Sequence, residues 1–198
     1  IIRRAESKCK EILNLLNERE GIVYKNTVEE NYRDVYFLDE ENHLIDVVVQ
    51  NIDLEFDNEF EKASAFYVLF QTCLIKRPFN LFHRKNLSLR TNHTTSNFGN
   101  KITWEKSFHE LFEQFISELR EIQFNNGRIN NITNTSALNC NVEADLVYID
   151  PPYFNSKGSH ISYHSRYHFL EGLTNYNELG DFISLEKNNK EIQINHSK

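Results

Sequence analysis

Four apolar residues, Leu146 to Ile149, stand directly before the tetrapeptide Asp150-Pro151-Pro152-Tyr153. Such a run, without alternating polar residues, is typical of a parallel strand that is covered on both faces. The two prolines fix φ and remove N–H donors, so the turn after the strand is rigid and presents carbonyl groups. We therefore expect an α/β fold. Ligands of open α/β folds bind outside the carboxyl ends of the strands, which places the predicted site at Asp150.

Helical periodicity of the apolar residues predicts that most of the chain before this strand is helical. The run 47–49 is β-branched and would also suit a strand, so two interpretations stay open there. Pro78 and Gly127 predict the ends of two of the helices. The expected helices cover about residues 5–17, a segment that begins at Asp39, about 59–76, a segment that begins at Thr103 or Ser107, and a segment that begins within 168–173.

The charge of the chain is unevenly distributed. The net charge of −7 argues against a protein that simply coats nucleic acid. Between Lys76 and Lys106, however, seven Lys and Arg residues face only Glu105. This basic segment predicts one surface for an anionic partner, and the alternative is a solvated basic face.

The cysteines and the apolar segments exclude several classes of protein. Cys9, Cys73 and Cys140 are odd in number and far apart, and they form neither a metal-binding spacing nor a disulfide framework. We therefore expect a cytoplasmic protein in a reducing compartment, without a bound metal. No apolar run approaches the length of a membrane span.

The histidines at 160, 164 and 168 recur every fourth residue, with Glu171 nearby. On a helix this spacing would suit a metal site. The interpretation that we favour is a loop beside the active site, because Gly158 and Ser159 are typical of loops. Tyr163 and Tyr167 would then line a base pocket, or serve as ordinary core or surface aromatics.

The tetrapeptide suits the activation of an exocyclic amino group on a base. Such a nitrogen is a weak nucleophile because its lone pair is delocalised into the ring. The Asp150 carboxylate and the Pro151 carbonyl can accept its two hydrogens and aim the lone pair outward, while Pro152 keeps the turn rigid. Tyr153 offers a flat face for stacking. Catalysis would then consist mainly of positioning and electrostatic preorganisation.

A base inside a duplex must be flipped out before such chemistry, and the duplex must be held through its phosphates. The basic segment supplies candidates for these contacts, and the Asn86 amide is able to read an adenine edge. The predicted DNA-binding residues are Lys76, Arg77, His83, Arg84, Lys85, Asn86, Arg90 and Lys101.

The segment from Ala144 to Tyr153 resembles Dam-type bacterial adenine-specific DNA methyltransferases. Three further stretches carry the same resemblance: Leu74 to Leu87, Phe98 to Trp104 and Tyr167 to Leu173. Together they cover roughly residues 5–190. The resemblance implies a site-specific enzyme that methylates adenine in double-stranded DNA, usually beside a cognate restriction endonuclease, with S-adenosylmethionine as co-substrate and no metal.

The resemblance also implies an organisation. Residues 1–130 would be mainly helical and contain the target-recognition insertion at about 76–106, and residues 131–198 would form a partial Rossmann-like catalytic region. Asp150 would contact both the target amine and the methionine end of the donor. Ser136 stands where an acidic residue of the family usually contacts the adenine of the donor.

One departure from the family concerns the donor. The six glycines of the chain include no G-x-G pattern, so the family's donor-binding glycine motif is missing. We therefore expect an internal fragment or a truncated gene product. Two alternatives stay open: a catalytically inactive DNA-binding fragment, and methylation of another amine, either the exocyclic amine of cytosine or a glutamine amide.

Overall fold

The computed structural model describes residues 10–92, 101–122, 127–129, 131–133, 135–150 and 162–193. The chain divides into two compact units, of which the first comprises residues 1–122 and 163–198 and the second residues 123–162. The division at residue 130 that the sequence suggested stays a prediction. None of the described helices is both long and apolar enough to cross a membrane.

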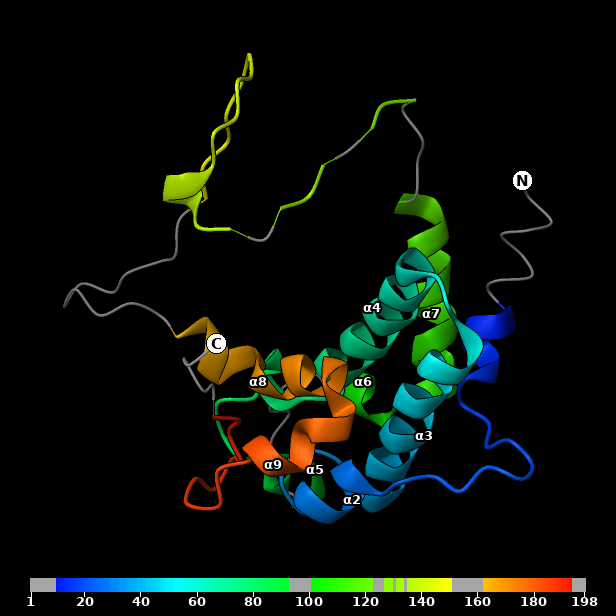
Figure 1. The fold of residues 1–198 in the computed structure, drawn as a ribbon. Coiled ribbons are helices and arrows are strands. Elements are labelled where there is room, and N and C mark those ends of the chain that lie inside the picture. Colours follow the sequence, from blue (N-terminus) through cyan, green and yellow to red (C-terminus); the bar gives the residue numbers. More distant parts are fainter. Residues whose placement is uncertain are drawn as a thin grey trace. The chain divides into compact units, whose positions relative to one another are not determined.

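The described residues of the first unit form helices and irregular connecting segments (Figure 1). Its labelled helices are α2 (Thr27–Asn31), α3 (Asp39–Glu55), α4 (Glu59–Ile75), α5 (Ser88–Thr91), α6 (Lys101–Glu105), α7 (Phe108–Ile122), α8 (Tyr163–Thr174) and α9 (Leu179–Phe182), with short 3-10 turns at Pro78–Asn80 and Tyr176–Glu178. The helices predicted from Asp39 onward, at about 59–76 and from about residue 107 are thereby confirmed. The segment 168–173 lies within α8.

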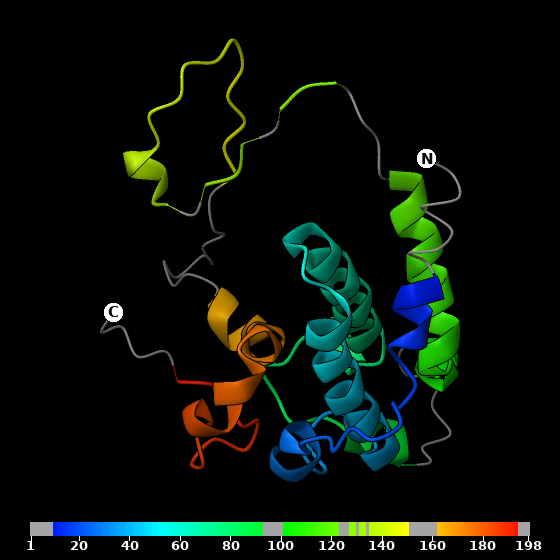
Figure 2. The same ribbon diagram turned by 45° about the vertical axis from the view of Figure 1, so that its right-hand side comes forward.

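The long helices α3, α4 and α7 form the scaffold, and α4 packs against both of the others (Figures 1 and 2). α3 begins where the Glu41 side chain accepts a hydrogen bond from the backbone N–H of Leu38 at 3.1 Å. α4 begins at Asn58, whose side chain accepts from the N–H of Phe60 and of Glu61. The buried face of α7 includes Leu111, Phe112 and Phe115.

The β-branched run 47–49 lies inside α3, and its three valines are buried. Burial of this whole stretch against neighbouring helices outweighs the small helix penalty of valine, so the helical interpretation is the correct one.

α8 joins the scaffold through a cluster of aromatic rings. Phe169 stacks on Phe82 with ring centroids 4.9 Å apart, and meets Tyr32 edge to face at 4.9 Å and Tyr36 at 5.4 Å. All four rings are fully buried. Edge-to-face and stacked pairs at these separations contribute about 0.5–1.5 kcal/mol each beyond the burial of their area. The loop that contains Phe82 is therefore held between α8 and the α2–α3 segment.

The predicted α/β fold, and with it the Rossmann-like region, is wrong for the residues that the structure describes. They contain helices and irregular segments, and their one β interaction is an isolated antiparallel bridge between Ile183 and Ile192. The expected strand at 145–149 has no regular secondary structure, and Leu146 to Ile149 are 63–86% exposed. A strand requires the N–H and C=O groups of a neighbouring strand, and no described residue supplies them to this run.

His168 connects α8 to two other segments of the first unit. Its Nδ1 accepts from the Ile192 N–H at 3.3 Å, so its Nε2 carries the proton and faces the Phe82 carbonyl at 3.2 Å and the Tyr36 hydroxyl at 3.1 Å. Burial lowers the pKa of His168 to about 4, although the Phe82 carbonyl partly opposes this effect. The imidazole is consequently neutral in the folded protein.

This depressed pKa predicts that the folded chain loses stability in mild acid. The unfolded chain takes up a proton at His168 near pH 6.5, so the contribution is complete above that pH and is lost as the pH falls toward 4. The free energy of unfolding of the unaltered chain should fall between about pH 7.5 and about pH 5. In His168→Gln this fall should be smaller by roughly 2 kcal/mol. Urea denaturation at the two pH values measures it. The exposed His109 on α7 gives the control His109→Gln, and an equal change in both variants would contradict the prediction.

Candidate functional site

The catalytic segment predicted from the sequence belongs to the second unit. Asp150 is exposed, and no hydrogen bond or ion pair joins its carboxylate to another described residue. Ser136 is also exposed and caps the 3-10 turn Ala137–Asn139, where its hydroxyl accepts from the Leu138 N–H at 3.4 Å. The predicted residues Pro151, Pro152 and Tyr153 lie outside the described residues.

The eight predicted DNA-binding residues all belong to the first unit, where they fall into two groups. Lys76, Arg77, Asn86 and Arg90 have side chains that are mostly or fully inaccessible to solvent. Arg84, Lys85 and Lys101 are exposed, and His83 is partly buried. The basic segment therefore directs some of its polar groups into the protein and others to the surface.

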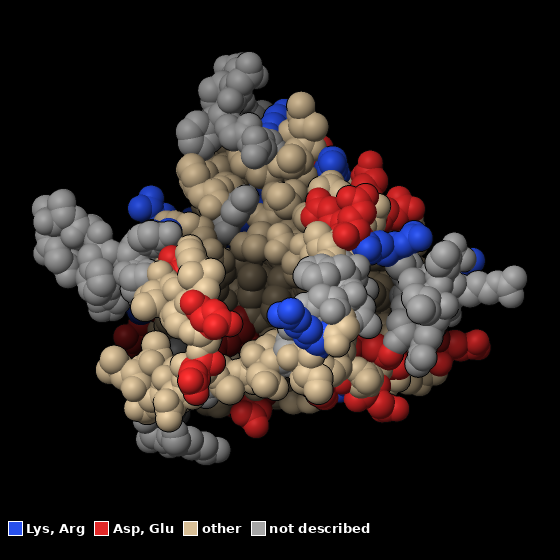
Figure 3. Space-filling model, turned by 90° about the horizontal axis from the view of Figure 1, so that it is seen from above, with Lys and Arg blue, Asp and Glu red and all other residues tan. Residues whose placement is uncertain are grey.

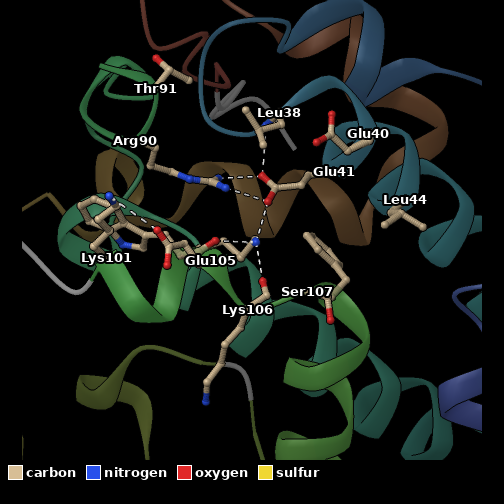
Figure 4. A pocket seen from close by; sticks show the side chains of 13 residues that line it. Leu38, Glu40, Glu41, Leu44, Arg90, Thr91, Lys101, Glu105, Lys106 and Ser107 are labelled. Atoms are coloured by element: carbon tan, nitrogen blue, oxygen red, sulfur yellow. Dashed lines mark hydrogen bonds and ion pairs between the residues drawn. The ribbon is translucent and has the colours of Figure 1, made fainter. Parts of the chain in front are cut away.

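Lys76 and Arg90 neutralise one buried carboxylate, that of Glu41. Lys76 Nζ lies 2.7 Å from Glu41 Oε1, and Arg90 forms a two-pronged contact with Nη1 and Nη2 each 2.7 Å from a Glu41 oxygen (Figure 4). All three side chains are no more than 7% exposed. Burial by itself raises the pKa of Glu41, but Arg90 and Lys76 outweigh it and hold this pKa below its ordinary value. The carboxylate is ionised and joins α3, the end of α4 and α5.

Lys76 also donates to the backbone carbonyls of Trp104 at 2.8 Å and Lys106 at 2.6 Å. It thereby connects the same ion cluster to α6 and to the start of α7. Next to the cluster lies a cavity of about 430 Å³. The Lys101–Glu105 pair, with nitrogen and oxygen 3.7 Å apart, lies at this cavity and is exposed (Figure 4).

Arg77 is buried beneath the loop that follows α4 and bonds to its backbone. Its guanidinium lies 4.1 Å from the ring centroid of Tyr36 and 5.1 Å from that of Phe82. Its Nη2 donates to the carbonyls of Leu81 and Arg84, each at 2.9 Å. Burial lowers the pKa of Arg77 to about 9, so the side chain remains charged at neutral pH.

Asn86 braces the same loop, because its amide donates to the Pro78 carbonyl at 3.0 Å. With Arg77, it fixes both ends of the stretch between Pro78 and Asn86. Arg84 and Lys85 lie between these attachments and point their charges to solvent. The loop is thus a rigid support for exposed cations.

Glu41 is the member of this arrangement that the sequence did not reveal. It stands in an acidic stretch, and nothing in its neighbourhood distinguishes it from the solvated acids beside it. The useful signal is the glutamate three positions after Leu38, since a glutamate at this position of the first turn can accept from the backbone N–H of the N-cap residue.

His164 and His168, the two histidines of the repeat that the structure describes, bond to other groups of the protein. His164 Nε2 lies 2.7 Å from the Ile192 carbonyl, and both nitrogens of His168 have partners. In the described part of the chain, no three His, Cys, Asp or Glu side chains are grouped as metal ligands. On the face seen in Figure 3, basic and acidic side chains are interspersed and neither kind forms a continuous surface.

Comparison with known proteins identifies the class to which the chain belongs. The model of the D12 class N6 adenine-specific DNA methyltransferases matches residues 4–191, so the chain is a member of this family. It is 28% identical over 141 residues to the Type II methyltransferase M2.HphI of Haemophilus parahaemolyticus, an alignment that covers 68% of this chain and 42% of that protein. The chain thus spans less than half of the relative's length. No solved structure matches it.

The buried ion cluster predicts a large effect of a small substitution. Glu41→Gln preserves the shape of the side chain but leaves Lys76 and Arg90 buried without a neutralising charge. We expect the free energy of unfolding to fall by about 3–5 kcal/mol. Chemical denaturation followed by circular dichroism measures it.

The exposed pair at the same cavity supplies the matched control. Glu105→Gln removes one partner of an ion pair whose side chains are about two-thirds exposed. Its cost should stay below about 1 kcal/mol. Equal losses for the two variants would show that burial of Glu41 does not make its charge important.

Proposed function

We propose that this chain takes part in the transfer of a methyl group from S-adenosylmethionine to the N6 amine of adenine in DNA, as the modifying partner in a restriction-modification system. The observation that carries the proposal is the family match across residues 4–191, which includes the Asp150-Pro151-Pro152-Tyr153 tetrapeptide. The relative named above is a Type II methyltransferase, which supports the restriction-modification setting.

In this proposal the tetrapeptide presents the target adenine. The Asp150 carboxylate and the Pro151 carbonyl accept the two amine hydrogens, Pro152 keeps the turn rigid, and Tyr153 stacks on the extrahelical base. Asp150 is exposed, which supports a direct contact between its carboxylate and a substrate. No strong base is needed, since the nitrogen loses its proton after it has become cationic.

The donor would be held by Asp150 and Ser136. The chemistry of these two groups suits the ends of S-adenosylmethionine, because a carboxylate accepts from an ammonium group and a hydroxyl can bond to a nucleoside. S-adenosylmethionine supplies an electrophilic methyl group when bound. Calorimetric titration of the chain with this donor tests the assignment, and unchanged binding by Ser136→Ala and Asp150→Ala would contradict it.

The DNA would be held by the basic segment, whose residues have two roles. Arg84, Lys85, Lys101 and the partly buried His83 are accessible enough to contact phosphates. The other four predicted residues would support DNA binding indirectly, because their polar groups already bond within the protein and hold the segment in place. These residues are Lys76, Arg77, Asn86 and Arg90.

Asp150→Ala tests the catalytic role. The variant keeps the backbone but loses one of the two proposed hydrogen-bond acceptors for the target amine. We expect the rate of methylation to fall at least about a hundredfold, while DNA affinity changes less than about twofold because the phosphate contacts lie elsewhere. Labelled methyl transfer to DNA and fluorescence anisotropy measure the two quantities.

Asp145→Ala is the matched control, since Asp145 is an exposed aspartate in the same segment and should be neutral in both assays. Absence of label from adenine with the unaltered protein, beside an active reference enzyme, would contradict the proposed activity. Label on cytosine, identified by mass spectrometry of the nucleosides, would instead assign the chemistry to the other exocyclic amine.

A further inference from the structure

The outer face of α8 carries two stacked aromatic rings and one cation. Tyr163 and Tyr167 have ring centroids 6.4 Å apart and an interplanar angle of 13°, and they are 44% and 39% exposed. Arg166 lies on the same face by helical spacing, while His168 and Phe169 point into the core. The exposed tyrosines are therefore not needed to bury α8.

This face of α8 adjoins the loop that holds His83 and Arg84. The Phe82 N–H donates to the Arg166 carbonyl at 2.9 Å, so His83 and Arg84 follow directly from a contact with α8. Burial, and then the positive charges of Arg84 and Arg166, lower the pKa of His83. Charges from segments far apart in the sequence thus act on one imidazole.

Arg84, which is exposed, and Arg166, which is partly buried, differ from the cations inside the protein. Lys76 and Arg90 each contact Glu41, and Arg77 bonds to two carbonyls. No acid or hydrogen-bond acceptor among the described residues meets the side chains of Arg84 and Arg166. Neighbouring cations without an internal anion repel each other, and binding of a phosphate relieves that repulsion.

The tyrosine pair complements such a phosphate contact. Surfaces that hold single-stranded nucleic acid combine a row of cations for the backbone with aromatic rings on which bases stack. Isolated exposed tyrosines are ordinary, but two parallel rings within one helical turn of an arginine that has no acidic partner in the described part of the chain match this combination.

We propose that Tyr163, Arg166 and Tyr167 of α8 form, with Arg84, a nucleic-acid contact surface in which the arginines hold phosphates and the tyrosine pair stacks on an unpaired base. The proposal rests on the proposed function, because it takes DNA as the partner. It adds α8 to the contacts that the basic segment was expected to provide.

Arg166→Gln tests the phosphate contact by the salt dependence of DNA binding. Each lost phosphate contact reduces the slope of log K against log salt by about 0.9 on duplex DNA. We expect Arg166→Gln and Arg84→Gln each to show about this reduction, and Arg166→Lys to retain the slope of the unaltered chain. Arg120→Gln is the control, since Arg120 is an exposed arginine in the last turn of α7, a helix that contributes no residue to the proposed surface, and its slope should not change.

The outcome separates this proposal from the proposed function. If the unaltered chain shows no salt-dependent DNA binding, both proposals fail. If it binds and Arg84→Gln reduces the slope while Arg166→Gln behaves as Arg120→Gln, the α8 surface is refuted and the proposed function stands. Circular dichroism confirms that each variant retains its helices.

The double variant Tyr163→Ser, Tyr167→Ser tests the stacking pair. Loss of a base-stacking platform should weaken binding of a single-stranded oligonucleotide about tenfold, with no change in the salt slope, because no cation is removed. Tyr163→Phe, Tyr167→Phe retains the rings and should bind as the unaltered chain does. An unchanged affinity of the serine double variant would refute the stacking role.

Discussion

The neutralisation of Glu41 is the interaction on which the arrangement of the basic segment depends. This carboxylate lies in the interior at the start of α3, where an isolated charge would be costly. Lys76 reaches it from the end of α4, and Arg90 from α5. The two cations fix the end of α4 and α5 against the start of α3, because each of them contacts the same carboxylate. These two cations attach the basic segment to α3 at two points.

Cations within this short stretch serve two purposes that their chemistry alone does not separate. Arg77 is fully buried, with its guanidinium against Tyr36 and Phe82, whereas Arg84 is exposed. Their connection is direct, because Arg77 donates to the Arg84 carbonyl. A buried arginine therefore fixes the backbone from which an exposed arginine extends, and rigid support of this kind reduces the conformational entropy that a bound phosphate must remove.

Local structure in this chain could be predicted from the sequence, whereas structure that depends on partners could not. Spacing of apolar residues predicted α3, α4 and α7, since a helix satisfies its own backbone. The run 145–149 has the composition of a buried strand, but a strand depends on neighbours that composition cannot supply. In the same way, Lys76 and Lys85 look alike in the sequence, and only the position of Glu41 in space makes one of them internal. α8 contacts the loop at residues 82–84, although the two segments are about eighty residues apart in the sequence. Local apolar patterns cannot predict such a contact.

Phe82 connects the stability of the core with the position of the exposed cations. Its ring stacks on Phe169, its carbonyl faces Tyr36 and His168, and its N–H donates to Arg166. A displacement of this residue would therefore disturb the buried polar network and the surface beside it together. Closely packed interiors respond to strain as a unit. Protonation of His168 in acid would replace a neutral ring by a buried charge beside Phe82, so the loss of core stability and the loss of the hydrogen bond between Phe82 and the Arg166 carbonyl should occur over the same pH range.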